Sequence, residues 1–184
     1  TDKIKKSGLL GLVIEPISDS QTFLNPDAKS MKTILITGAT GYIGRRLTSL
    51  LLEDGTYEIR LLVRNRKKVQ LSIMDQVDIR EGDTFDKELL HRSLKGVDTA
   101  FYLIHSMGST EDYRDLDRLS AENFRESCIA AGVRRIVYLG GLGVKKDASK
   151  HLLSRIETGE ILSEKPQQIQ TIWLRAGVII GSGS

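Results

Sequence analysis

Cysteine is nearly missing from this chain of 184 residues, in which Cys128 is the only one. A single thiol forms neither an internal disulfide framework nor a cysteine-built zinc site. Its place in a helical pattern indicates a buried, unreactive side chain. The chain also has no apolar run near the ~20 residues that a membrane-spanning helix needs. The sequence therefore predicts a protein of a reducing compartment, cytoplasmic and without a membrane span.

An excess of charge of one sign is lacking as well. The chain has 27 Lys and Arg against 24 Asp and Glu, a formal net charge of +3, and the basic residues are spread along it. We therefore expect no nucleic-acid partner. The length suits one domain with a sizeable core.

Residues 1–30 differ in pattern from the rest. Three lysines precede an apolar run at residues 9–14, as at the start of a signal peptide, but neither an initiating Met nor a small-residue cleavage site accompanies them. Turn-forming residues follow, and Met31 is a plausible natural start. We interpret residues 1–30 as an irregular or artificially added extension, with an extra edge strand as the alternative.

The stretch that organises the chain is T-G-A-T-G-Y-I-G at residues 37–44. It follows a short β-branched run typical of a buried parallel strand and opens into an amphipathic pattern typical of a helix. Gly38 permits a sharp turn, Gly41 leaves room for a pyrophosphate beside the backbone, and Gly44 lets the helix pack closely on the sheet. Phosphates then lie at the helix N-terminus. The alternative is a glycine-rich turn without a ligand.

Strand and helix patterns alternate along the rest of the chain. Strands are predicted at residues 32–36, 57–63, 77–80, 97–104, 134–139 and 171–175, and helices at 45–53, after Asp86, at 113–131 and at 152–162. Short connections between such units imply a parallel sheet with helices on both faces. The predicted fold is α/β, a doubly wound parallel sheet in three α/β/α layers, the NAD(P)-binding Rossmann fold.

The glycine spacing, with Thr37 before it, resembles the extended and atypical short-chain dehydrogenase/reductase superfamily. Further segments are similar to bacterial NAD(P)H-binding proteins of the nucleoside-diphosphate-sugar epimerase-like and NmrA-like kind: Y-L-I-H-S-M-G at 102–108, Y-L-G-G-L-G at 138–143 and S-R-x-E-x-G-E at 154–160. The resemblance covers residues 31–184. Because the chain of such relatives continues well past the last strand, we expect most of a substrate-binding part to be absent here.

The end of the second predicted strand decides which dinucleotide fits. An acidic residue there would accept hydrogen bonds from the ribose 2′-hydroxyl of NAD, whereas an arginine accommodates the 2′-phosphate of NADP. The sequence has Arg64, with Arg66 nearby, and no carboxylate. A guanidinium grips a phosphate with two charge-assisted hydrogen bonds. NADP(H) is therefore predicted over NAD, with a solvated basic turn as the alternative.

The ends of later strands supply further expected contacts. In short-chain dehydrogenase relatives an Asp after the third strand accepts a hydrogen bond from the adenine amino group, and Asp83 matches that position. Ligands bind near the switch point of a doubly wound sheet, so the end of the fourth strand should line the nicotinamide side. His105 there is either a hydrogen-bonding helper or a catalytic acid. The predicted cofactor contacts are Gly38, Thr40, Gly41, Tyr42, Ile43, Gly44, Arg64, Arg66, Asp83, Thr84, Leu103, Ile104, His105, Ser106 and Arg155.

The catalytic pair of the superfamily is missing. Active members carry a Ser after the fifth strand and a Tyr-x-x-x-Lys on the next helix. Here glycines occupy the serine position, and the predicted helix at 152–162 contains neither Tyr nor Lys. Candidate proton donors in this region are His151 and Ser154, and the sequence assigns catalysis to neither.

Arg155 stands near the place of the family's lysine. It either takes over the ribose or phosphate contact or forms a surface salt bridge with Glu157 or Glu160. The sequence leaves both interpretations open.

Three functions remain open at this point. The first is an NADP-dependent oxidoreductase of an unknown small molecule with an unorthodox proton donor; the second is an NADPH sensor or scaffold without turnover. An epimerase-like enzyme is third, since it needs a proton-transferring group where the Tyr is missing. Many members of the superfamily that the sequence resembles pair through two long helices, here residues 113–131 and 152–163, so the resemblance implies a homodimer.

Overall fold

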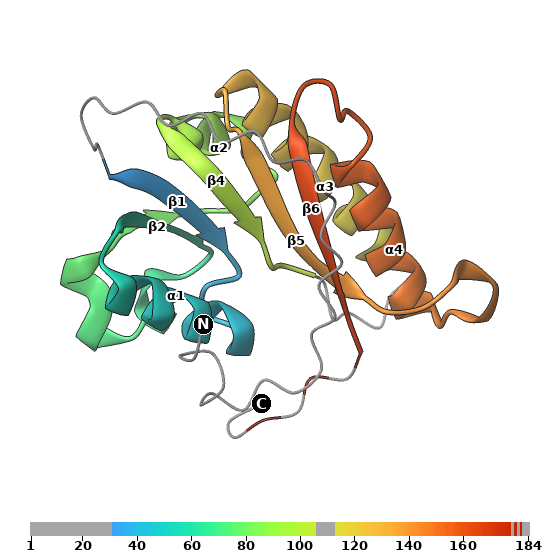
Figure 1. The fold of residues 1–184 in the computed structure, drawn as a ribbon, viewed down its shortest axis with the longest axis horizontal. Coiled ribbons are helices and arrows are strands. Elements are labelled where there is room, and N and C mark those ends of the chain that lie inside the picture. Colours follow the sequence, from blue (N-terminus) through green and yellow to red (C-terminus); the bar gives the residue numbers. More distant parts are fainter. Residues whose placement is uncertain (1–30, 106–112, 178, 180, 182–184) are drawn as a thin grey trace, which may run out of the picture.

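A parallel sheet of six strands forms the centre of the computed structural model (Figure 1). The strands are β1 (Lys32–Thr37), β2 (Tyr57–Val63), β3 (Asp78–Glu81), β4 (Val97–Tyr102), β5 (Arg135–Gly141) and β6 (Gln170–Ala176). Their order is β3-β2-β1-β4-β5-β6, and each neighbouring pair is parallel. The winding reverses between β1 and β4, as in doubly wound nucleotide-binding sheets. The predicted fold class is confirmed.

The structure describes residues 31–105, 113–177, 179 and 181. The predicted extension at residues 1–30 and the predicted contact Ser106 lie outside the described residues. None of the helices in the described part is long and apolar enough to cross a membrane.

Helices cover both faces of the sheet (Figure 1). The α-helices are α1 (Tyr42–Asp54), α2 (Lys87–Leu94), α3 (Tyr113–Ala130) and α4 (Lys150–Leu162). Helix α1 packs on β1 and β2, and α2, α3 and α4 form the layer on the other face. Three short 3₁₀ helices lie in the connections: η2 (Arg66–Lys68), η3 (Leu71–Gln76) and η4 (Lys145–Asp147). Sequence periodicity did not predict them, because turns this short carry little of an apolar repeat.

Each face of the sheet has its own apolar core. On the α1 face, Ile36 and Leu61 are buried with side chains of α1 against them. On the other face, Leu90 and Phe124 are fully buried, and so is Cys128, whose pKa is raised by burial. The predicted inert thiol is therefore confirmed as a core residue.

Capping residues set the helix boundaries. The Asp86 side chain accepts a hydrogen bond from Leu89 N at 2.9 Å and begins α2, as predicted. The Ser149 hydroxyl accepts one from Leu152 N, so α4 begins before the predicted start at residue 152. A side-chain cap of this kind satisfies one of the N–H groups that a helix leaves unpaired at its start.

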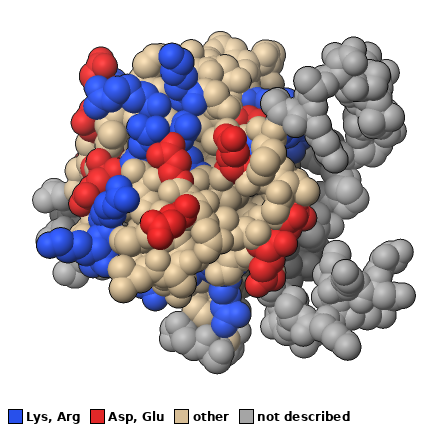
Figure 2. Space-filling view, turned by 90° about the vertical axis from the view of Figure 1, so that its left-hand side faces the viewer, with Lys and Arg blue, Asp and Glu red and all other residues tan. Residues whose placement is uncertain are grey.

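Figure 2 shows the face at the β2 and β3 end of the sheet, where basic and acidic side chains alternate. On this edge Asp78 accepts hydrogen bonds from Arg60 Nε at 2.7 Å and from Arg80 Nη2 at 2.9 Å. Partial burial alone would raise the pKa of Asp78, but the hydrogen bonds from Arg80 and Arg60 outweigh it and hold the pKa below its ordinary value. These pairs stabilise an edge strand that is largely exposed.

Candidate dinucleotide-binding and active site

A cleft of about 810 Å³ opens at the carboxyl ends of the strands. It lies where the turn after β1, the end of β2, the turn after β3 and the end of β4 come together, and α3 contributes Leu116, Asp117 and Ser120. This is the switch point of the sheet, the place where doubly wound folds bind their ligands.

The glycine loop has the geometry that its sequence predicts. Gly38 has a φ of +68°, and a Cβ there would lie 2.6 Å from the carbonyl oxygen of Leu103. A Cβ on Gly44 would collide with the backbone of Gly38 and Ala39, so α1 packs directly on the turn. Gly41 N donates to Gly38 O at 3.0 Å and closes the turn. A side chain at Gly38 or Gly44 would push the loop out of shape.

The start of α1 differs from the starts of α2 and α4. Among the described residues, no side chain caps α1, whose N-cap is Gly41, and its first turn has no acidic residue. The first-turn N–H groups, which belong to Tyr42, Ile43 and Gly44, therefore remain available, and the helix dipole adds partial positive charge. Gly38, Thr40 and Gly41 line the cleft in front of them. These residues fit a pyrophosphate.

Thr37 joins the two halves of the sheet at the cleft. Its buried hydroxyl donates to Phe101 O at 3.0 Å and accepts from Leu103 N at 3.2 Å. Strand β4 accordingly ends at Tyr102, two residues before the predicted end, and the chain leaves the sheet there. This turn brings Leu103, Ile104 and His105 into the cleft wall, where they line it as predicted.

The end of β2 forms a basic wall of the cleft. Arg64, Asn65 and Lys68 line the cleft, whereas Arg66 is exposed on η2 and is not among the lining residues. The Asn65 side chain accepts from Lys67 N at 2.9 Å and begins η2. Residues three apart share a side of a 3₁₀ helix, so this turn directs Lys68 to the same side as Asn65. Sequence reasoning passed over Lys68 because it treated the basic run as a loop.

The turn after β3 holds the expected adenine contacts. Asp83 lines the cleft, and its Oδ1 accepts from Phe85 N at 3.3 Å. The Thr84 hydroxyl lies 2.6 Å from Ser120 Oγ, which in turn is 2.7 Å from the Tyr102 hydroxyl. Burial raises the pKa of Tyr102 far above its ordinary value, so this network stays neutral. Thr84 lies at the cleft wall, but its hydroxyl ties the turn to α3.

A second cavity of about 440 Å³ lies between the ends of β5 and β6 and the start of α4. Its lining consists of Gly141, Leu142, Ser149, His151, Leu152, Arg155, Ala176, Gly177 and Ile179. Arg155 is therefore at this cavity and not among the residues that line the nucleotide cleft. Its Nη2 donates to Leu139 O at 3.1 Å.

The salt bridges predicted as an alternative for Arg155 involve other basic residues. Glu157 pairs with Arg114 at 2.7 Å, and Glu160 pairs with Lys145 at 2.7 Å. These two carboxylates pair with other residues, and the Arg155 guanidinium donates to strand β5.

His105 lines the first cleft and interacts electrostatically with Arg155 and His151, which line the second cavity. Partial burial lowers its pKa, and the positive charge of Arg155 and the neighbouring His151 lower it further, while Asp117 opposes them. Asp117 is buried and accepts a hydrogen bond from Ser154 Oγ at 2.9 Å. The balance of these influences favours the neutral form of the His105 imidazole.

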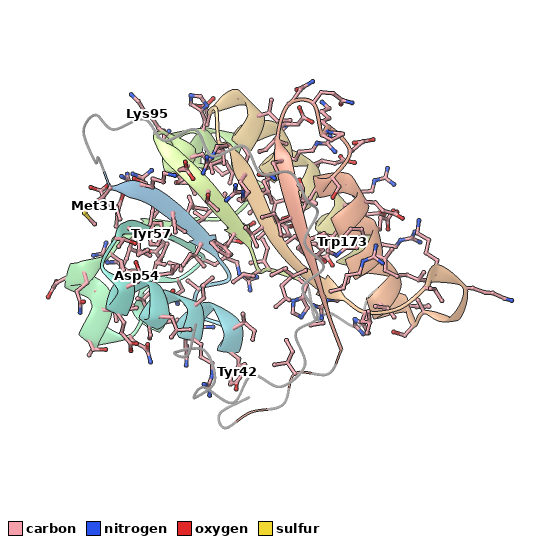
Figure 3. All side chains as sticks on the ribbon, viewed as in Figure 1. Met31, Tyr42, Asp54, Tyr57, Lys95 and Trp173 are labelled. Atoms are coloured by element: carbon pink, nitrogen blue, oxygen red, sulfur yellow. The ribbon has the colours of Figure 1, made fainter. Side chains whose placement is uncertain are left out.

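Packing explains why glycine stands at the serine position. A Cβ on Gly140 would collide with the Trp173 indole, and one on Gly141 would lie 2.5 Å from Leu152 Cδ1. A Cβ on Gly159 of α4 would also collide with Trp173, which extends from β6 towards α4 (Figure 3). The indole thus occupies the space that side chains on β5 and α4 would need.

Comparison with known proteins agrees with this geometry. Residues 38–175 match the model of a family described as NAD(P)H-binding. A (4-alkanoyl-5-oxo-2,5-dihydrofuran-3-yl)methyl phosphate reductase from Streptomyces griseus is 30% identical over 122 residues, which cover 66% of this chain and 39% of that protein. A 2-alkyl-3-oxoalkanoate reductase from Stenotrophomonas maltophilia is 31% identical over 109 residues, covering 57% of this chain and 32% of that protein.

Solved structures of larger proteins share the fold. An NADPH-dependent quinone oxidoreductase from Escherichia coli, in complex with NADPH, has a TM-score of 0.64 at 27% identity, covering 77% of this chain and 48% of that one. A nucleoside-diphosphate-sugar epimerase from Staphylococcus aureus, at 23% identity, has a TM-score of 0.65 and likewise covers 77% of this chain and 50% of that one. The chain thus spans about half the length of these structures, and less of the curated relatives. It belongs to the NAD(P)H-binding family of atypical short-chain dehydrogenase/reductase-like Rossmann proteins.

Proposed function

We propose that the protein is an NADP(H)-dependent oxidoreductase that reduces a small carbonyl compound without the usual Tyr-x-x-x-Lys pair. The observation that carries the proposal is the cleft itself, with an uncapped helix N-terminus at one wall and Arg64 and Lys68 at another. Bound NADPH supplies a hydride. Two curated relatives at about 30% identity are reductases, which supports the same reaction class.

Each wall of the cleft has one task in this proposal. The N–H groups at the start of α1 bind the pyrophosphate, and Arg64 with Lys68 binds the 2′-phosphate. Asp83 accepts from the adenine amino group. The segment from Leu103 to His105 orients the nicotinamide towards the second cavity.

A fluorescence titration with NADPH and NADH tests the cofactor preference. Arg64→Ala should weaken NADPH binding by about 10-fold or more, because a charge-assisted hydrogen bond contributes about 1.5–3 kcal/mol. NADH binding should hardly change. Arg66→Ala is the matched control, since Arg66 adjoins the same turn without lining the cleft. Equal affinities of wild type for both dinucleotides would overturn the NADP preference.

A sensor or scaffold without turnover is the second candidate. It is favoured by the glycines at the serine position and the absence of Tyr and Lys from residues 152–162 of α4. Substrate-dependent oxidation of NADPH across ketones, aldehydes and quinones separates the two candidates. Tight NADPH binding with no oxidation above the rate of the protein-free control would favour the sensor.

Pairing of two copies through α3 and α4 is a further part of the proposal. The two helices pack side by side, and Leu119 of α3 is 46% exposed. A second copy packed on this face would cover that apolar side chain. Sedimentation velocity at micromolar concentration should give a dimer, and only monomer would contradict the pairing.

A further inference from the structure

Helix α4 presents two polar side chains to the second cavity. His151 and Arg155 are four residues apart, which places them on one face of the helix, and both line the cavity. The rest of the lining is mostly apolar, with Leu142, Leu152, Ala176 and Ile179. A volume of about 440 Å³ is within the range of small-molecule sites, which are typically apolar with a few convergent polar groups.

Arg155 is fixed in place by the sheet. Its Nη2 donates to Leu139 O at 3.1 Å, and the Tyr138 hydroxyl donates to the carbonyl oxygen of Arg155 at 2.8 Å. This turn of α4 is therefore tied to β5 by hydrogen bonds on both sides. A guanidinium held in this way adds a permanent positive charge to the cavity lining.

Charged and titratable groups from two helices surround His105, which follows β4. Arg155 and His151 of α4 and Asp117 of α3 all interact with it electrostatically. The carboxylate of Asp117 is buried and accepts a hydrogen bond from Ser154, and it lines the first cleft and not the second cavity. The cavity lining itself has no carboxylate among the described residues. Such a site favours an oxygen that carries negative charge.

We propose that the second cavity binds a carbonyl compound with apolar substituents, and that His151 and Arg155 hold its oxygen. The pair His-x-x-x-Arg has the spacing of the missing Tyr-x-x-x-Lys. Arg155 stabilises negative charge on the oxygen, and His151 protonates it. The reaction step, but not the binding, rests on the proposed reductase function.

The proton and electron balance of the step is simple. The carbonyl carbon gains the hydride from NADPH, and the C=O π pair becomes the oxyanion. An N–H bond of the His151 imidazolium breaks as an O–H bond forms on the oxyanion. The products of this proton transfer are the alcohol and a neutral imidazole. Since the His151 side chain is exposed, solvent returns the proton.

Histidine NMR tests the binding without any turnover. The chain has three histidines, so ¹³C-labelled imidazoles give a simple spectrum, and His91 on α2 is an internal control. Benzoate serves as the probe, because its carboxylate mimics the oxyanion and its ring fills an apolar cavity; benzylamine is the matched cationic control. We expect benzoate, and not benzylamine, to shift the His151 signal and to leave His91 in place.

Variants then separate this inference from a merely structural role. His151→Gln should weaken benzoate binding about tenfold and leave NADPH affinity unchanged, while His91→Gln should alter neither. Arg155→Lys should retain more benzoate affinity than Arg155→Gln, since the lysine keeps the charge. In turnover, His151→Gln should lower kcat.

The outcomes are distinguishable from those of the cofactor titration. Unchanged benzoate affinity in His151→Gln, or loss of NADPH affinity in that variant, would overturn the inference. A protein that binds no NADPH but shows the His151 shift would refute the proposed reductase and still support the binding site.

Discussion

The two halves of the sheet meet at the carboxyl ends of the strands, but they line the cavities there with different kinds of atoms. In its part of the cleft, the half formed by β1, β2 and β3 uses backbone at the start of α1, a glycine turn and an uncapped helix start, beside the side chains of Arg64, Lys68 and Asp83. The half formed by β4, β5 and β6 builds its part from side chains, with His105, His151 and Arg155 around two cavities. Backbone geometry depends on a few glycines, whereas side-chain chemistry can be exchanged residue by residue.

The helix starts illustrate the same difference. Helix α1 leaves its first N–H groups uncapped by any described side chain, whereas Ser149 caps α4 through Leu152 N. The first helix is therefore suited to bind an anion through its backbone. At α4 the backbone is satisfied, and the helix contributes its side chains instead.

Substitution of Gly38 should cause the largest loss of stability, because a left-handed backbone and crowding by Leu103 O coincide there. Gly38 and Gly55 have nearly the same φ, +68° and +69°, but only Gly38 is crowded, by Leu103 O. Gly55→Ala should cost about 1 kcal/mol from the left-handed backbone alone. Gly38→Ala should cost roughly 2–4 kcal/mol and weaken NADPH binding. Urea unfolding measures both, and equal costs would show that the close approach to β4 contributes nothing.

In the half formed by β4, β5 and β6, the corresponding test concerns the space that the Trp173 indole fills. Gly159→Ala forces a methyl group against the indole and should destabilise by roughly 1–3 kcal/mol. Trp173→Leu should relieve part of that cost in the double variant, so the two changes should be strongly non-additive. A double-mutant cycle from thermal or urea unfolding gives the coupling. Additive costs would mean that the indole is not what excludes side chains from this space.

Two strand tyrosines compare hydrogen bonds in the second half. The Tyr102 hydroxyl belongs to a buried network with Ser120, and the Tyr138 hydroxyl donates to a backbone carbonyl of α4. Each Phe substitution should cost about 1 kcal/mol, measured by urea unfolding. Tyr138→Phe should also loosen Arg155 and weaken benzoate binding, whereas Tyr102→Phe should not. Equal effects on benzoate would argue against the tie between β5 and α4.

His105 should give the smallest effect on stability. Its pKa is lower in the fold than in the unfolded chain, so the unfolded chain binds more protons between that value and 6.5. Stability should therefore fall as the pH drops from about 6.5 towards the lowered pKa. Between pH 7.5 and 5.5, the Tm of His105→Gln should fall by about a degree less than the Tm of the wild type. His91→Gln is the control and should not show this difference. An unchanged slope in His105→Gln would contradict the electrostatic cluster.

The sequence predicted most of the fold because its signals are local. Five of the strands lie within a residue or two of their predicted bounds, and β2 matches residues 57–63. Strand β4 ends before its predicted end because the Thr37 hydroxyl, which is distant in sequence, accepts the hydrogen bond of Leu103 N–H. The 3₁₀ turn η2 was not predicted, and with it the position of Lys68 in the cleft was missed.

By itself, the sequence determined the glycine turn, the doubly wound order of elements and the loss of the usual catalytic pair. These depend on residue type and spacing along the chain. Only the tertiary structure decided that Arg155 lies at the second cavity, that Glu157 and Glu160 pair elsewhere, and that His151 shares the cavity with Arg155. The ion pairs join α3 and η4 to α4, and the cavity forms where β5, β6 and α4 pack together, so neither follows from spacing along the chain.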